Sequence, residues 1–280
     1  MALRPEQTVA IVELFMKHGR IFRLSDDFLI VQDGGLFGLF SVKESTLVLP
    51  VEFEVIRAFE GPLSPLADHG FCYIEKDGKG GILSLSKRQV ILAVEIGCIA
   101  PFLYGLFRVS SVNYGLFSPL MGGRLVLPME YGRMDAKSAD LGDGLIKIPS
   151  PDGSKFGIFS TVYSTLVLKV EYHAISDHPT APNLLALRKG KRLGFFSREK
   201  CRVVLPVEYR GVGHISADLC LVSTEDAEYG VFSLSLGGLV VPLGQRRISW
   251  LTGELFTLMD HEGNVHLYST EEKASLGTKE

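Results

Sequence analysis

The stretch LGFFSREKCRVVLPVEYRGV, from Leu193 to Val212, is the clearest copy of a phrase that recurs along this chain of 280 residues. Its first half, Leu193 to Ser197, sets a glycine among apolar residues and ends on a serine. Its second half, Arg202 to Tyr209, is rich in β-branched and apolar residues and contains Pro206. Short apolar runs on both sides of a polar turn are typical of two β-strands joined as a hairpin.

The phrase occurs six times and the start of a seventh follows. The copies align on a glycine, at Gly38, Gly81, Gly115, Gly157, Gly194 and Gly230, with His266 in the seventh place. A serine stands three residues later in each copy, at Ser41, Ser84, Ser118, Ser160, Ser197, Ser233 and Ser269. The steps between copies, 43, 34, 42, 37, 36 and 36 residues, indicate a repeat architecture in which each unit buries its apolar face against its neighbours.

Two further residue types keep their place in the second half of the phrase. Proline recurs at Pro50, Pro128, Pro206 and Pro242, and glutamate recurs at Glu52, Glu95, Glu130, Glu171 and Glu208. We interpret the glycines as points of close backbone approach or bulges, and the prolines as edge positions that need no N–H. The glutamates suit local ion pairs or turn caps better than an acidic ring or a shared metal site, and the serines are given the same structural interpretation.

This pattern resembles the WG, or KWG, repeat family, whose units read aromatic-Gly-hydrophobic followed by a Val-Ile-Pro-x-x-Tyr strand. The resemblance runs from about Leu36 to Ser269. The family tryptophan is replaced here by Phe37, Tyr114, Phe156, Leu193 and Tyr229, and the aspartate expected after the glycine strand is a serine. The resemblance implies an interaction scaffold rather than an enzyme.

Each unit contains two more predicted strands, one before the phrase and one after it. In the fifth unit these are Asn183 to Leu187 and Gly211 to Ile215. We therefore expect an all-β repeat protein of six to seven four-stranded units, the size of propeller blades. A seven-bladed β-propeller-like ring is favoured over an open β-solenoid, because Arg20 to Leu24 could pair with the last unit and remove two open sheet edges. The expected organisation is an N-terminal helix at 1–19, a single repeat domain at 20–270 and a flexible tail at 271–280.

The N-terminal segment from Arg4 to Gly19 is the one strong helical stretch. Pro5 near its start, apolar residues spaced for one face, and Gly19 at its end are typical of an amphipathic helix. Glu13 interrupts the apolar run, which argues against a signal peptide. Two roles stay open for this helix: it caps the repeat array, or it docks a partner.

The composition excludes several classes of function. The net charge of −3 and the pI near 6.2 give no reason to expect nucleic acid or an anionic membrane as a partner, and no apolar run approaches the roughly 20 residues of a membrane helix. The four cysteines, Cys72, Cys98, Cys201 and Cys220, form no C-x-x-C pair and have no partner histidines at metal spacing. Disulfide pairing stays open, but the lack of a signal peptide favours reduced cysteines in a cytoplasmic protein. No phosphate-binding loop, dinucleotide fingerprint, nucleophile elbow or zinc-protease helix occurs, and no cofactor is expected.

Two groups of residues are candidate partner-binding sites, because loops vary between repeats and commonly carry binding. The first is a basic turn made of Arg188, Lys189, Lys191 and Arg192, with acidic Glu225, Asp226 and Glu228 in the next unit. Such a charged rim would steer a charged protein partner, although solvated hairpin turns explain it equally well.

The second group lies in two longer insertions, Glu60 to Gly70 and Ser176 to Asn183, which contain the pairs Asp68-His69 and Asp177-His178. Together the two pairs could form a metal site or an acid–base device.

Three functions follow in order of preference. The first is a non-enzymatic protein-binding scaffold or a regulatory or inhibitory subunit. The second is a small-ligand or glycan binder with an axial pocket. The third is a hydrolase or isomerase with axial Asp and His residues, which would bring Asp68, His69, Asp177 and His178 together with perturbed pKa values.

Overall fold

The computed structural model describes residues 4–60, 64–253, 255–269 and 274–279. Within these ranges three helices accompany the strands, α1 (Pro5–His18), α2 (Ser64–Asp68) and α3 (Ala136–Ala139), together with a short 3-10 turn at Leu103–Gly105. The chain divides into two compact units, Met1–Ala136 and Lys137–Glu280, so the boundary falls at the start of α3. None of the helices in the described part of the chain has the length and apolarity that crossing a bilayer requires.

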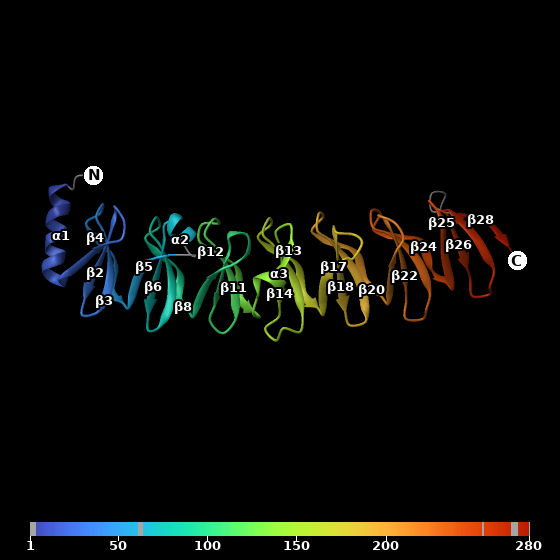
Figure 1. The fold of residues 1–280 in the computed structure, drawn as a ribbon, viewed down its shortest axis with the longest axis horizontal. Coiled ribbons are helices and arrows are strands. Elements are labelled where there is room, and N and C mark those ends of the chain that lie inside the picture. The colour runs from blue at the N-terminus through green and yellow to red at the C-terminus, as the bar shows by residue number, and fades with distance from the viewer. Residues whose placement is uncertain (1–3, 61–63, 254, 270–273, 280) are drawn as a thin grey trace. The chain divides into compact units, whose positions relative to one another are not determined.

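The fold is all-β and is built from seven four-stranded antiparallel sheets of blade-like form, which we name A to G in chain order (Figure 1). The first unit holds sheet A, with β1 (Arg20–Arg23), β2 (Phe28–Asp33), β3 (Leu36–Ser41) and β4 (Thr46–Phe53); sheet B, with β5 (Val55–Ala58), β6 (Phe71–Lys76), β7 (Lys79–Ser84) and β8 (Gln89–Ile96); and sheet C, with β9 (Cys98–Pro101), β10 (Phe107–Ser110), β11 (Tyr114–Ser118) and β12 (Arg124–Tyr131).

The second unit holds the other four sheets, with the same order of strands. They are sheet D, with β13 (Asp140–Gly142), β14 (Leu145–Pro149), β15 (Phe156–Ser160) and β16 (Thr165–Tyr172); sheet E, with β17 (Ala174–Asp177), β18 (Leu184–Lys189), β19 (Arg192–Ser197) and β20 (Arg202–Tyr209); sheet F, with β21 (Gly211–His214), β22 (Leu219–Ser223), β23 (Tyr229–Ser233) and β24 (Gly238–Gln245); and sheet G, with β25 (Arg247–Thr252), β26 (Leu255–Met259), β27 (Val265–Ser269) and β28 (Ala274–Lys279). The sequence prediction of four-stranded repeat units is confirmed.

The limits of each unit differ from the prediction by one strand. We expected the strand that follows the phrase to complete its sheet, but β21 pairs with β22 in the next sheet. Only Arg210 separates β20 from β21, and one residue is too short for an antiparallel hairpin, which needs at least two. The chain therefore leaves each sheet at its fourth strand and begins the next one.

This shift also changes the expected roles of the chain ends. Arg20 to Leu24 was expected to complete the last unit, but β1 pairs with β2, with Arg20 opposite Gln32. Sheet G takes its fourth strand from β28, which pairs with β27. The predicted strand exchange between Arg20 to Leu24 and the last unit is therefore wrong. The predicted tail at 271–280 contains β28 at Ala274–Lys279, while residues 271–273 and 280 lie outside the described residues. The flexibility of this tail stays a prediction.

The core of each unit lies between consecutive sheets, which stack face to face. Within the first unit, Leu39 of sheet A packs with Ile74 of sheet B in one buried cluster. In the second unit, Ile158 of sheet D packs with Phe196 of sheet E, and further clusters join sheet E to sheet F and sheet F to sheet G. Each sheet therefore buries its apolar faces against its neighbours, as the repeat period predicts. That the repeats at 20–270 make one domain stays a prediction.

The recurring glycine stands where two strands approach closely, as predicted. A methyl group on Gly194 would lie 2.5 Å from the carbonyl oxygen of Leu205, because the pairing of β19 with β20 shifts register on both sides of Phe195. The same shift occurs in the corresponding strand pairs of sheets A, C, D and F. The recurring prolines are exposed on the fourth strand, at the outer edge of each sheet, where a missing N–H costs no hydrogen bond.

Two of the recurring glutamates form the local ion pairs that we predicted. Glu52 lies 3.1 Å from the Nζ of Lys76, and Glu171 lies 2.9 Å from the Nζ of Lys189. In both cases the glutamate is on the fourth strand of one sheet and the lysine ends the second strand of the next. These pairs therefore connect consecutive sheets.

Helix α1 packs on sheet A and runs from Pro5 to His18, within the helix predicted at 1–19, of which residues 1–3 lie outside the described residues. Leu14 is buried with Val31 and Phe40, flanked by Ala10 and Ile11 of the helix. The buried Gln7 donates from Nε2 to the carbonyl of Val42 at 3.1 Å. Gly19, with φ of 85°, ends the helix by donating its N–H to the carbonyl of Phe15 at 2.8 Å.

Candidate functional site

The turn between the third and fourth strands of a sheet has the same geometry in most copies. We name it the serine turn, and its residues are 42–45, 85–88, 119–123, 161–164, 198–201 and 234–237 in sheets A to F. The serine before the turn is buried, and its Oγ accepts the backbone N–H three residues later. The pairs are Ser41 with Glu44 (3.3 Å), Ser84 with Lys87 (3.2 Å), Ser160 with Tyr163 (3.3 Å), Ser197 with Lys200 (3.1 Å) and Ser233 with Leu236 (3.1 Å).

The last residue of each serine turn has a left-handed backbone. These residues are Ser45, Arg88, Gly123, Ser164, Cys201 and Gly237, with φ between 47° and 68°. A fixed hydrogen bond at one end and a left-handed residue at the other hold the backbone of the turn in one conformation. The side chains at the tip are then free to differ without changing the fold.

The tips in the second unit carry large apolar side chains that are exposed. In sheet D, Val162 is 73% exposed and Tyr163 is 61% exposed, and in sheet F Leu236 is 70% exposed. Sheet E, which stacks between them, presents Glu199 and Lys200 at the same place. This end of the second unit is therefore apolar on both sides of a charged pair. Single exposed apolar residues are common on protein surfaces, but apolar side chains gathered at one end of a molecule mark interaction sites.

A cleft of about 180 Å³ lies between the tips of sheets E and F. Glu199, Lys200, Asp218 and Ser235 are among its lining residues. Asp218 accepts from the hydroxyl of Ser233 at 2.7 Å and from the N–H of Ser235 at 2.6 Å. Partial burial acts to raise the pKa of Asp218, but these hydrogen bonds outweigh it and hold the pKa below its usual value. The cleft is smaller than the roughly 300–1,000 Å³ of most small-molecule sites.

Asp177 and His178 lie at the same end of the second unit, between β17 and β18. The Asp177 carboxylate forms an ion pair with Arg198, whose side chain is 10% exposed. The Nδ1 of His178 accepts the N–H of Ala181 at 3.2 Å. Its ring packs edge-on against Phe195, with 4.9 Å between ring centroids. Asp177 therefore ties the end of β17 to the serine turn of sheet E, while His178 holds its own loop in place.

A second imidazole lies beside His178. The ring of His214 is 5.3 Å away between centroids. Burial, and then the neighbouring His214, lower the pKa of His178. His178 is therefore neutral at pH 7, which agrees with the lone pair that its Nδ1 offers to Ala181.

Asp68 and His69 lie in the first unit, where α2 ends before β6, and both are exposed. Part of their insertion, 61–63, lies outside the described residues. The two Asp-His pairs belong to different compact units, so a site that joins them stays a prediction. Among the residues that the structure describes, no group of three or more His, Cys, Asp or Glu side chains is arranged to hold a metal ion.

The predicted basic turn lies at the opposite end of sheet E, between β18 and β19. Lys189 is held by Glu171, and the N–H of Gly190 donates to the Nδ1 of His173 at 2.9 Å. The hydrogen bond from Lys189 lowers the pKa of Glu171. Three cations of the turn remain exposed to solvent: Arg188, Lys191 and Arg192. The turn is therefore anchored to the preceding sheet, and its charge stays available to a partner.

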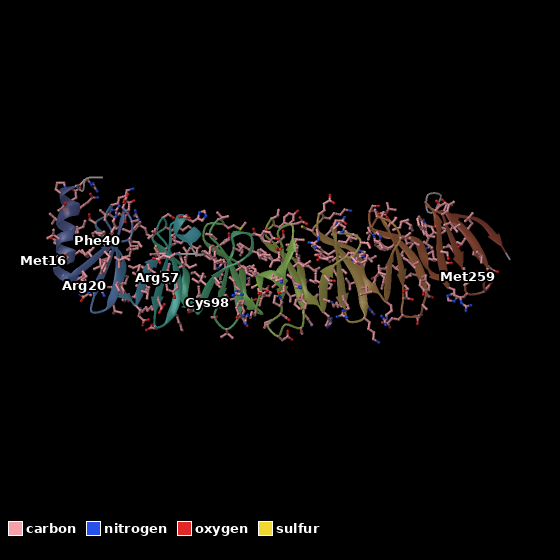
Figure 2. The ribbon with its side chains drawn as sticks, viewed as in Figure 1. Met16, Arg20, Phe40, Arg57, Cys98 and Met259 are labelled. Carbon is pink, nitrogen blue, oxygen red and sulfur yellow. The ribbon has the colours of Figure 1, made fainter. Side chains whose placement is uncertain are left out.

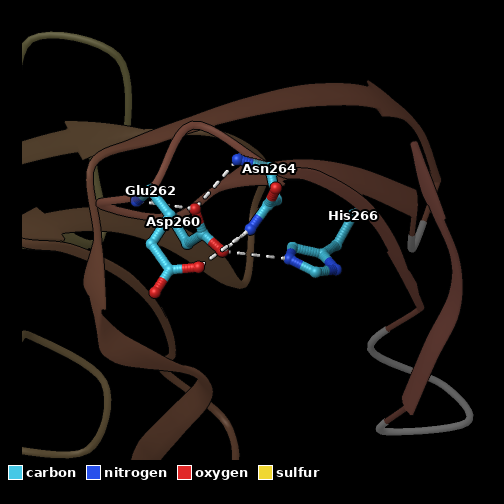
Figure 3. A network of polar contacts seen from close by, with 4 residues as sticks. All are labelled: Asp260, Glu262, Asn264 and His266. Carbon is cyan, nitrogen blue, oxygen red and sulfur yellow. Dashed lines mark hydrogen bonds and ion pairs between the residues drawn. The ribbon is translucent and has the colours of Figure 1, made fainter. Parts of the chain in front are cut away.

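The neighbouring turns at that end are acidic. Glu225 and Asp226 are exposed in sheet F. In sheet G, the Asp260 carboxylate accepts the N–H groups of Glu262 and Asn264, both at 2.9 Å, and lies 3.4 Å from the Nε2 of His266 (Figure 3). Asp260 therefore closes its own turn. The predicted dipolar arrangement of a basic turn followed by acidic turns is present in the sequence of these turns, while its binding role stays a prediction.

The cysteines divide by their burial. Burial raises the pKa of Cys72 and of Cys220 to about 12, so both are small buried apolar residues as predicted. Cys98 is exposed and Cys201 is half-buried, and all four are free.

The exposed tips Val162, Tyr163 and Leu236 were not among our predicted site residues. The repeat alignment could have indicated these residues, because they follow the recurring serine at positions where the residue type differs from copy to copy. Sequence reasoning favoured charged and proline-rich loops as binding sites and did not consider the apolar residues of these turns.

Comparison with known proteins does not assign this chain to a family. No model of a known protein family matches the chain, and no curated protein matches it. Among solved structures, the computationally designed Ika8 protein covers 92% of this chain and 85% of its own length, with 8% identity and a TM-score of 0.27. Hsv2 from Kluyvelomyces marxianus covers 92% of this chain and 97% of its own length, with 12% identity and a TM-score of 0.25. Similarity at this level carries no argument about function.

Proposed function

We propose that this chain is a non-enzymatic protein-binding scaffold, and that the serine turns of sheets D, E and F form its binding surface. The observation that carries the proposal is the exposure of Val162, Tyr163 and Leu236 on turns whose backbone is held by buried serines. A rigid turn loses little conformational entropy when its tip is covered, so exposed apolar side chains on it contribute most of their burial energy to binding.

The charged pair between the apolar tips suits a protein partner. Apolar contacts supply affinity, while Glu199 and Lys200 would set register and exclude partners with the wrong charge. The cleft between sheets E and F, at about 180 Å³, has room for a single side chain of a partner. The second candidate, a small-ligand binder, finds less support, because this volume lies below the usual range for ligand sites.

The remaining parts of the proposal follow from the sequence. The resemblance to WG repeats supports an interaction scaffold, and a role as a regulatory or inhibitory subunit in the cytoplasm belongs to the same proposal. The anchored basic turn, Arg188 to Arg192, is the second candidate surface on the same scaffold.

A comparison of two matched variants tests the proposal. One variant replaces the apolar tips (Val162→Ser, Tyr163→Ser, Leu236→Ser), and the other replaces the free cations of the basic turn (Arg188→Ser, Lys191→Ser, Arg192→Ser). Each purified chain would be used as bait in a lysate of the source organism, with mass spectrometry of what is retained.

We expect the wild type and the basic-turn variant to retain one protein in stoichiometric amount, and the tip variant to lose it. If only the basic-turn variant failed to retain the partner protein, the binding surface would lie at the other end of sheet E, on the basic turn. A wild-type chain that retains no protein at micromolar concentration would refute the scaffold.

A further inference from the structure

Helix α1 has two apolar faces, and only one of them is covered. The inner face, with Ala10, Ile11 and Leu14, packs on sheet A. The outer face carries Val9, Val12, Phe15 and Met16, which are 55%, 54%, 52% and 79% exposed. Figure 2 shows Met16 on the side of the helix away from sheet A. A helix that only caps a sheet typically has a polar outer face, so this apolar face is a candidate for a further contact.

The outer face is open to solvent along the first three turns of the helix. A groove of about 470 Å³ lies against it, lined by Pro5, Thr8, Val9, Val12 and Glu13 among the described residues. Gln7 and Leu14 on the inner side, and the Gly19 stop, fix the helix on sheet A. The exposed face is therefore presented by a rigid element, as a binding surface requires.

The charges on the flank of α1 are arranged symmetrically about its centre. Glu6 and Lys17 are 11 residues apart, which is close to three helical turns, so they lie on the same flank. They also stand at equal distances from the midpoint of Pro5–His18. Glu6 already lies 3.1 Å from a guanidinium nitrogen of Arg4 in an exposed ion pair. A two-fold axis at that midpoint would set this carboxylate against the partner's Lys17 as a second cation and repeat the arrangement on the other side.

One charge on this flank opposes such pairing. Glu13 lies near the midpoint, so a two-fold axis would bring it towards the partner's Glu13. Glu13 lies beside Val9 and Val12 on the outer face, so the two carboxylates would come closer to the contact than Glu6 and Lys17 do, and their repulsion counts against the pairing. Two attractive pairs and a continuous apolar contact oppose this one repulsion.

We infer that two copies of this chain associate through the outer faces of α1, which pack antiparallel about a two-fold axis near Ile11 and Val12. This surface is separate from the serine turns, so the inference stands independently of the proposed function. A contact made by two short helices lies at the small end of interface sizes, so we expect a roughly micromolar dimer that dissociates on dilution.

Sedimentation velocity of the full chain across a concentration series tests the association. We expect twice the chain mass at about 100 μM and the chain mass at about 0.1 μM, on the scale of a micromolar dissociation constant. Val12→Asp should raise the dissociation constant at least about tenfold, because an unpaired carboxylate would be buried in the contact. The matched control is Val112→Asp, since Val112 is 91% exposed and lies on the turn between β10 and β11.

A charge exchange tests the antiparallel arrangement separately. Glu6→Lys and Lys17→Glu should each weaken the dimer, and the double variant should restore it, because the pairs re-form with reversed sign. Circular dichroism at low concentration checks that every variant keeps its fold.

A wild-type chain that stays monomeric at 100 μM overturns the inference, and so does a dimer unaffected by Val12→Asp. A double variant as weak as the single variants would overturn the antiparallel pairing.

Discussion

The recurring serine and glycine of the repeat each make a local contact with the backbone. The buried serine in the phrase binds a backbone N–H of its own turn, and the glycine leaves room for a carbonyl oxygen of the next strand. Neither residue reaches a solvent-exposed site. Repetition in every unit therefore indicates a structural role here, while the residues that differ between units are the ones exposed to partners.

Replacing the glycine of the phrase should destabilise the fold. In Gly194→Ala the new methyl group would lie 2.5 Å from the Leu205 carbonyl oxygen and 2.7 Å from a Val207 methyl, so the strands must separate at a cost of about 1–3 kcal/mol. The control is Gly238→Ala, where a methyl group meets no atom within 4 Å. Urea unfolding of both variants measures the difference. Equal midpoints would show that the close approach at Gly194 contributes nothing to stability.

The pH dependence of stability should report the Asp218 hydrogen bonds. The pKa of Asp218 is lowered in the folded chain from an ordinary value of 3.8, so its contribution is complete above that value and is lost as pH falls through the folded pKa. Asp218→Asn should therefore be less stable than wild type at pH 6, by on the order of 1 kcal/mol. The two proteins should converge towards pH 2. Thermal unfolding between pH 2 and pH 6 measures both curves, and a constant gap would contradict this role.

At the scale of elements, the helix could be predicted from sequence but its two faces could not. Pro5, Gly19 and the apolar spacing fix where α1 begins and ends. Val9, Val12 and Met16 fit an apolar stripe as well as Ala10 and Leu14 do, and only the packing on sheet A separates them. The same limit applies to sheet boundaries, because the spacing of strands does not reveal that a single-residue connection such as Arg210 ends a sheet.

Truncation on each face of α1 should distinguish the covered side from the exposed one. Leu14→Ala removes a buried side chain from the cluster with Val31 and Phe40, at a cost of about 2–3 kcal/mol. Val12→Ala, on the outer face, should change the stability of the monomer by less than about 0.5 kcal/mol. Denaturant unfolding at submicromolar concentration keeps self-association out of the measurement. A large effect of Val12→Ala under these conditions would mean that the outer face is covered within one chain.

At the scale of the whole molecule, the repeat period predicts the seven sheets but not how they cooperate. Glycine and serine spacing locates the hairpin between the third and fourth strands of each sheet, since these residues have local backbone roles there. The tips of the serine turns carry no such constraint, so Val162, Tyr163 and Leu236 could be recognised only from their exposure. The repeat period also does not predict the boundary between the two compact units at Ala136, because the same contacts between neighbouring sheets occur within both units.

Separating the chain at that division tests whether it folds as one domain. Residues 1–136 hold sheets A to C and residues 137–280 hold sheets D to G, and each group buries its apolar faces between its own sheets. Stability in a stacked array is close to a sum over units and neighbouring contacts, so we expect each fragment to fold alone and to unfold cooperatively. Circular dichroism and denaturant unfolding of the two fragments, beside the intact chain, provide the measurement. Fragments without β-structure would instead show that the repeats at 20–270 form a single cooperative domain, because each half would then need the other to complete its folding.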